Sequence, residues 1–199
     1  MAPFDAQAEY EDERFKDVVL EAAQVQDKHF YNCAFVDCAF GETAFHRCRF
    51  VDCTFQGCDL SMIRLEDTSF SETRFVGSKA VGVNWALAAW PGYTVESPVR
   101  FENCVLNYST FIGLTLHKIG FTGCTASDVD FSEADLTEAD FANAVLTKSR
   151  FRQTNLTRAN FVGATEYSID ITANTVTKAR FSFPEAMALL YSVDICLVE

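Results

Sequence analysis

A large apolar residue recurs at every fifth position of this chain, and this period constrains the possible folds more than any other feature. From Phe15 the series runs without interruption to Trp85. After a slip of one residue it resumes at Phe101 and continues to Phe181, broken only at Glu166. These positions hold 17 of the 19 phenylalanines, so the period reflects the fold and not a chance of composition.

Neither an α-helix nor a flat strand brings residues five positions apart to one face. Five helical steps of about 100° scatter them around the helix, and on a strand an odd spacing puts them on opposite faces. A chain that turns a corner after every five residues solves the problem. We therefore expect four-sided coils of 20 residues, in which Phe101, Phe121 and Phe141 stack in one column.

A second column of mostly small residues lies two positions before each large one. Zinc ligands usually occur in pairs two to four residues apart, whereas the spacing of five found here is that of the repeat itself. We interpret the thiols of this column as small buried side chains, and we expect no metal and no cofactor. The column contains Cys33, Cys38, Cys48, Cys53, Cys58, Cys104 and Cys124. Cys196 lies outside the pattern, and the sequence does not place it.

Charge and hydropathy exclude several classes of protein. The chain has 28 Asp and Glu against 16 Lys and Arg, a net charge of −12. This balance argues against direct binding of DNA phosphates and favours a basic partner. The first residues do not resemble a signal peptide, and no stretch is apolar enough to span a membrane. We expect a soluble, cytoplasmic protein.

The period also divides the chain into segments. Residues 1–13 are an acidic lead, either mobile or a solvated cap, and residues 14–85 form the first coils. Residues 86–100 hold the slip and form either a bend with one inserted residue or a loop of about ten residues that leaves the coil. We favour the bend, with a cis Trp90-Pro91 bond as one way to make it, because Trp90 and Val95 keep their frame positions. Residues 101–182 form further coils.

The C-terminal segment, residues 183–199, departs from the repeat. Pro184 and Glu185 are typical of a helix start, and the apolar residues that follow predict a short helix and then a terminal strand. The last coil of a solenoid must be covered, and exposed apolar residues mark interfaces. This segment therefore caps the rod, joins two copies of the chain, or does both. The residues assigned to a dimer interface are Phe183, Met187, Leu189, Leu190, Ile195 and Leu197.

No residue pattern typical of catalysis is present. The sequence has no Gly-rich phosphate loop and no G-x-S-x-G motif. His29, His46 and His117 are not clustered, and each lies beside a frame residue and should point outward. We expect a binding protein and not an enzyme.

A run of acidic residues between Ser127 and Asp140 contains no basic residue. In a four-sided coil, Asp130, Asp135 and Asp140 fall on three different faces, so they do not converge on one site. They are either part of the solvated surface or part of an acidic recognition surface, and the following coil is basic, which suits a specific protein partner. The full acidic set is Asp128, Asp130, Glu133, Asp135, Glu138 and Asp140.

The pentads beginning at Ala134, Ala139 and Ala159 read Ala-Asp-Leu, Ala-Asp-Phe and Ala-Asn-Phe. By this pattern the chain resembles the pentapeptide-repeat family over residues 13–182. The resemblance implies an all-β fold, a right-handed quadrilateral β-helix, followed here by the short C-terminal helix.

Three segments narrow the resemblance, namely residues 82–91, residues 167–171 and residues 181–186. They look like the group of pentapeptide-repeat proteins that gives immunity to albicidin and microcin and resistance to quinolones. That resemblance implies a DNA-mimicking rod that binds DNA gyrase, and topoisomerase IV, and protects it from topoisomerase poisons. It also implies a homodimer joined at the C-terminal ends, with the acidic set above as the surface that contacts gyrase. The alternative is a pentapeptide-repeat scaffold for protein interactions with no tie to gyrase.

Overall fold

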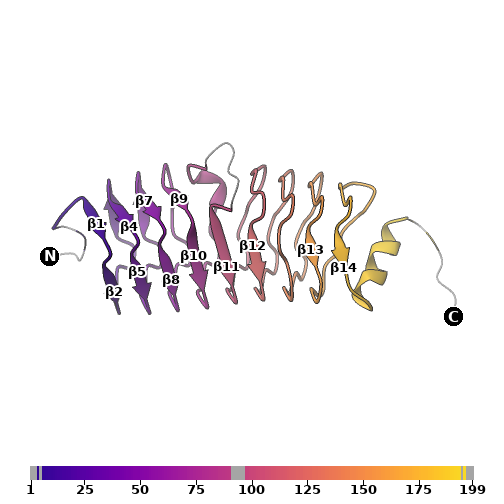
Figure 1. Ribbon diagram of the computed structural model, residues 1–199, viewed down its shortest axis with the longest axis horizontal. Coiled ribbons are helices and arrows are strands. Elements are labelled where there is room, and N and C mark those ends of the chain that lie inside the picture. Colours follow the sequence, from indigo (N-terminus) through magenta and orange to yellow (C-terminus); the bar gives the residue numbers. More distant parts are fainter. Residues whose placement is uncertain (1–3, 5, 91–96, 194, 196–199) are drawn as a thin grey trace.

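Short parallel strands, stacked one coil apart, form the walls of a rod (Figure 1). The computed structural model describes residue 4, residues 6–90, residues 97–193 and residue 195. Two short 3-10 helices, η1 (Trp85–Leu87) and η2 (Glu185–Val193), accompany the strands. The strands are β1 (Glu9–Glu11), β2 (Arg14–Lys16), β3 (Gln24–Gln26), β4 (His29–Tyr31), β5 (Ala34–Val36), β6 (Ala44–His46), β7 (Arg49–Val51), β8 (Thr54–Gln56), β9 (Ser69–Ser71), β10 (Thr73–Val76), β11 (Val99–Glu102), β12 (Gly120–Thr122), β13 (Asn160–Phe161) and β14 (Arg180–Phe181).

Pairing one coil apart determines the topology. In the regular part each strand pairs with the strand 20 residues later, as β4 does with β7 through Phe30 and Phe50. The sheets follow the orders β1-β4-β7-β9, β12-β11-β10-β8-β5-β2, β3-β6 and β13-β14. Isolated parallel bridges continue the walls through the C-terminal coils. The quadrilateral β-helix predicted from the five-residue period is thereby confirmed, with about eight coils.

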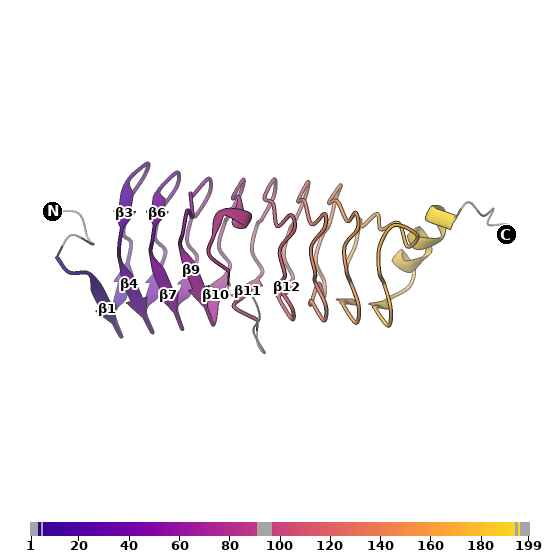
Figure 2. The same ribbon diagram turned by 90° about the horizontal axis from the view of Figure 1, so that it is seen from above.

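Both apolar columns point into the rod. The rings of the large column stack in parallel, as Phe35 and Phe55 do with centroids 4.5 Å apart and Phe141 and Phe161 at 4.8 Å. Rings of adjacent walls meet edge to face, which is the other favourable arrangement of aromatic pairs. The seven cysteines of the small column are buried and unbridged. The core is therefore one continuous stack along the axis of the rod (Figures 1 and 2).

The slip in the period corresponds to one enlarged coil. Phe101 of β11 pairs with Phe75 of β10, which lies 26 residues earlier and not 20. Trp90 still packs against Phe70 in the regular position, with ring centroids 6.1 Å apart, so the six additional residues fall between Trp90 and Ser97. The bend favoured from the sequence is wrong in its count, because one inserted residue would place Phe101 on the next wall. Pro91 and Val95 lie outside the described residues.

The N-terminal boundary lies earlier than the sequence indicated. Strand β1, within the expected acidic lead, pairs with β4, and Tyr10 stacks on Phe30. Phe4 is buried against these rings and covers the end of the core. Residues 9–13 thus belong to the first coil.

The last coil is irregular, and η2 covers it. Glu166 is exposed in a left-handed conformation, while Tyr167 and Ile169 take the inward places that the frame assigned to positions 166 and 171. The expected C-terminal helix is confirmed as η2, which lies at the end of the rod (Figure 2), and Leu189 packs against the core. The expected terminal strand falls outside the described residues apart from Ile195.

Candidate protein-binding surface

The edges of the rod carry much of its charge. One residue of each pentad forms a corner and has a left-handed backbone, with φ between 49° and 62° at the non-glycine corners. This conformation favours Asp, Asn and Gly. In the coils before Phe75, eight such corners are acidic and one is basic. The acidic corners are Asp12, Asp17, Asp27, Asp37, Glu42, Asp52, Asp67 and Glu72.

The acidic set predicted from the sequence lies in one coil and splits into two structural types. Asp130, Asp135 and Asp140 precede inward residues and bridge to three different walls, at Thr110, Thr115 and Gly120. They do not converge, as expected from the spacing. Asp128, Glu133 and Glu138 occupy three corners of the same coil.

The three aspartates on the walls are partly buried and hold the backbone together. Each accepts a hydrogen bond from the backbone N–H two residues later, at 3.0 Å for Asp130 and Asp135 and 3.1 Å for Asp140. Such local turns are a usual role of Asp. The Asp130 carboxylate also lies 3.2 Å from the Arg150 guanidinium. These three side chains are therefore structural before they are available to a partner.

Their environment also affects their titration. Burial by itself would raise the pKa of Asp130 and Asp135, but other interactions outweigh it and lower both values. For Asp130 these are hydrogen bonds from Ser132 and the charge of Arg150. For Asp135 they are hydrogen bonds from Thr137 and His117, whose Nε2 lies 3.2 Å from the carboxylate. Both carboxylates remain charged at neutral pH.

The corner acids of this coil are the more available ones. Glu133 is exposed, and the side chains of Asp128 and Glu133 make no hydrogen bond or ion pair with any described residue. Glu138 pairs with Arg158 of the next coil at 2.6 Å. Lysine occupies the same type of corner at positions 118, 148 and 178, so the backbone accepts either sign of charge there.

The net negative charge is greatest at the other end of the rod. Residues 1–72 contain 15 acidic and six basic residues, a net charge of −9, whereas residues 97–182 contain nine and eight, a net charge of −1. The search for a local acidic run missed this difference, which a comparison of the two halves would have found. The N-terminal coils, and not the predicted set alone, therefore form the strongly acidic surface.

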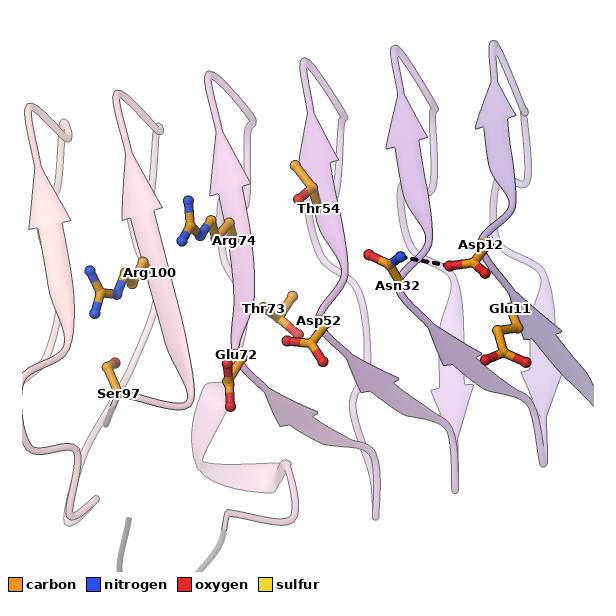
Figure 3. A pocket seen from close by; sticks show the side chains of 10 residues that line it. All are labelled: Glu11, Asp12, Asn32, Asp52, Thr54, Glu72, Thr73, Arg74, Ser97 and Arg100. Atoms are coloured by element: carbon orange, nitrogen blue, oxygen red, sulfur yellow. Dashed lines mark hydrogen bonds between the residues drawn. The ribbon is translucent and has the colours of Figure 1, made fainter. Parts of the chain in front are cut away.

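A groove of about 610 Å³ crosses the acidic coils (Figure 3). Its acidic edge carries Glu11, Asp12, Asp52 and Glu72, and Asn32 donates a hydrogen bond to Asp12 at 2.6 Å. Figure 3 shows the guanidinium groups of Arg74 and Arg100 on adjacent strands at the opposite end. The buried hydroxyls of Thr73 and Ser97 are bound to backbone carbonyls. The groove presents charge, and it contains no activated nucleophile.

The buried cysteines serve as hydrogen-bond donors. The Cys53 thiol donates to the Phe30 carbonyl at 3.4 Å, and burial raises the pKa of this thiol to about 12. Among the described residues, no group of three or more His, Cys, Asp or Glu side chains is arranged to hold a metal ion. His29, His46 and His117 lie apart on the walls and are partly buried.

The predicted dimer residues do not form one uniform surface. Phe183 is 81% exposed and Ile195 48%, whereas Leu189 packs on the core and Leu190 is partly buried. Leu197 lies outside the described residues. Sequence reasoning missed Tyr191, which is 77% exposed. The exposed apolar residues at this end are Phe183, Met187, Tyr191 and Ile195, which recur at a spacing of four that the sequence already showed.

The repeat, the walls and the corners define a class of protein, the pentapeptide-repeat proteins. Residues 28–111 and 97–170 match the model of the pentapeptide repeat region, so the chain belongs to this family. Comparison with curated proteins gives no significant sequence match. No helix of the described chain is long and apolar enough to cross a membrane.

Solved structures share the fold along most of the chain. A trypsin-treated variant of QnrB1, a plasmid-mediated fluoroquinolone resistance protein, has a TM-score of 0.72 at 17% identity, covering 96% of this chain and 99% of that one. Full-length QnrB1 gives a TM-score of 0.68 at 17% identity, covering 94% and 100%. HetL, a pentapeptide repeat protein involved in heterocyst differentiation regulation in the cyanobacterium Nostoc sp. strain PCC 7120, gives 0.55 at 15% identity, covering 87% of each chain.

Proposed function

We propose that this protein binds DNA gyrase, with topoisomerase IV as a second target, and protects the enzyme from poisons that trap it on cleaved DNA. It acts as a rigid acidic rod and not as an enzyme. The observation that carries the proposal is an end-to-end match of fold and length with a fluoroquinolone resistance protein, together with the acidic corners. The biological outcome is antibiotic resistance or self-immunity in the cytoplasm.

The dimensions support mimicry of duplex DNA. About eight coils at ~4.8 Å each give a rod of roughly 38 Å, and two rods joined end to end span roughly 77 Å, the length of about 22 base pairs. Such a dimer carries twice the net charge of −12, about half the charge of DNA of that length at one charge per ~1.7 Å. The placement of the charges must therefore contribute as well as their number.

The structure supports a division of labour along the rod. The N-terminal coils hold most of the net negative charge and meet the most basic part of the DNA-binding surface of gyrase. The predicted acidic set contributes through Asp128, Glu133 and Glu138, while Asp130, Asp135 and Asp140 hold the walls. The acidic surface does not bind DNA itself, because it lacks the clustered cations that release counterions from phosphates.

The homodimer forms through the C-terminal end in this proposal. Four exposed apolar side chains at the end of the rod favour an interface. Phe183, Met187, Tyr191 and Ile195 make the contact, Leu190 supports it, and Leu189 holds η2 on the core. Leu197 belongs to the same proposed interface.

A gyrase assay with a cleavage-complex poison tests the function. Wild-type protein should restore supercoiling at low concentration and inhibit the enzyme at high concentration by competing with DNA. Replacing Asp52, Asp67 and Glu72 with Lys should weaken both effects strongly, because the three corners lie on the acidic half. The matched set of Asp128, Glu133 and Glu138 to Lys should weaken them less. Absence of binding to gyrase at low salt, with no change in poison-induced cleavage at any concentration, would exclude the proposal.

The second candidate is a scaffold unrelated to gyrase. It is favoured by the shared fold of HetL, which is described as a regulator of differentiation and not as a resistance protein. In that case the protein binds neither gyrase nor topoisomerase IV, and its acidic coils bind another basic protein. The same assay separates the two candidates.

A further inference from the structure

The middle of the rod contains an uncharged band. Residues 80–95 and residues 103–117 contain no Asp, Glu, Lys or Arg, whereas charged residues recur every few positions elsewhere in the coils. The described parts of these two stretches lie in neighbouring coils, because Lys79 bridges to Val105 and Asn84 to Thr110. A rod that only imitated the phosphate backbone of DNA would carry charge through its centre as well.

Large apolar side chains are exposed on this band. Tyr108 is 67% exposed, Met62 56%, Leu87 47% and Ile112 43%. The Met62 side chain lies over Gly82 of the next coil, which has no side chain in the way. The Met62 N–H binds the Val81 carbonyl, and the Gly82 N–H binds the Asn107 carbonyl, each at 2.8 Å. Met62 and Tyr108 therefore line one edge of the rod.

The opposite edge of the same wall carries Leu87 and Ile112. Asn84 and Thr110 bridge within this wall, and Trp85 and Phe111 stack beneath it with ring centroids 5.8 Å apart. The wall between the two apolar edges is thus polar but uncharged, and it rests on a rigid aromatic pair. Soluble proteins rarely expose several large apolar side chains together unless the surface binds a partner.

Acidic residues flank the band on both sides along the rod. Glu66 and Asp67 precede it, and Asp128, Asp130 and Glu133 follow it. In a symmetric contact between two copies the same patches meet, so these acids would face one another. A second copy of this chain is therefore disfavoured on this wall, and so is nucleic acid. An apolar centre with a charged rim has the composition of a protein interface, and here the rim requires a basic counterpart.

We propose that this wall, with Met62, Leu87, Tyr108 and Ile112, is a contact site for a protein surface that is apolar at its centre and basic around it. The inference rests on the proposed function, in which that surface belongs to gyrase. The acidic corners attract the partner, and the apolar band fixes the position of the rod on it.

A variant that changes no charge tests the site. Met62→Asn and Tyr108→Asn suit the left-handed corners at these positions, and Ile112→Ser places the residue found one coil later at Ser132. The triple variant should bind gyrase about tenfold more weakly, as loss of an interface anchor does, and this loss should persist at raised salt. The double variant Val19→Ser and Val162→Ser, with exposed apolar residues elsewhere, should bind like wild type.

The outcomes separate the two ideas. If wild-type protein binds gyrase and the triple variant binds equally well, the band is not a contact site, although the proposed function stands. Equal losses in the triple variant and its control also overturn the site. If the wild-type protein does not bind gyrase, both proposals fail. Circular dichroism and sedimentation of each variant show whether fold and assembly are retained.

Discussion

The coils before residue 76 and those after residue 101 have the same cross-section but satisfy their backbones differently. In the first group the pentads are mostly short strands, and the carbonyl of a large inward residue accepts from a buried side chain 23 residues later. The Cys53 thiol binds the Phe30 carbonyl in this way, and the Thr73 hydroxyl binds the Phe50 carbonyl at 3.2 Å. The small inward column is therefore rich in Cys, Thr and Ser there.

In the second group most of these carbonyls accept the backbone N–H three residues later. Ala139 donates to Leu136 at 3.0 Å, and Ala144 donates to Phe141 at 3.1 Å. No inward donor is required, and alanine is sufficient. The turns are stabilised from outside instead, by Asp and Asn side chains that accept the N–H two residues later, as Asn155 does from Thr157. One fold thus has two solutions to the same hydrogen-bonding requirement.

The largest expected effect concerns what the two groups share. Phe55→Ala and Phe141→Ala should each lower the free energy of unfolding by about 3–5 kcal/mol, because both rings are fully buried and stacked on two neighbours. Chemical denaturation measures this, with Val19→Ala, at an exposed position, as the control. Losses that differ by more than about 2 kcal/mol would show that the stacks are not equivalent.

A smaller effect should appear in one group alone. Thr73→Val retains the shape but leaves the Phe50 carbonyl without its donor, which should cost about 1–3 kcal/mol. Thr73→Ser retains the hydroxyl and should cost less. Ala159→Ser, in the second group, should change the free energy of unfolding by roughly 0.5 kcal/mol or less, because the Leu136 carbonyl is already bound. A large stabilisation by Ala159→Ser would contradict the distinction.

The smallest effect is the dependence of the second group on acid. The folded-state pKa values of Asp130 and Asp135 are lowered, so the stability they contribute is present above the unfolded pKa and is lost as the pH falls through the folded values. Asp135→Asn should lower stability near neutral pH by about 1 kcal/mol or less and reduce the loss on acidification below about pH 4. Melting curves across pH measure it, with Glu133→Gln as the control. An unchanged pH profile for Asp135→Asn would contradict the assignment.

The comparison also explains what the sequence could predict. The period of five requires an inward column and a corner, so the four-sided solenoid follows from the positions of the phenylalanines. The same period cannot distinguish one inserted residue from six, because the two differ by a whole pentad. For that reason the enlarged coil before Phe101 was visible only in the register of β10 and β11.

The candidate surface was predicted less well, for a different physical reason. Acidic residues are informative in sequence only when their backbone positions are known. The pattern of Asp followed two residues later by Ser or Thr, as at Asp130 and Asp135, already indicates local turns. By contrast, the contact of Leu189 with the core and the exposure of Tyr191 depend on how η2 lies against the last coil, which apolar content alone does not determine.

The enlarged coil has a consequence for chain entropy. Closing a loop becomes more costly only with the logarithm of its length, so a coil of 26 residues in place of 20 requires about 0.2 kcal/mol more. Each coil closes independently on its predecessor. An insertion at one corner therefore leaves the other coils in register, and rods of this kind can gain or lose segments at their edges while the core stays the same.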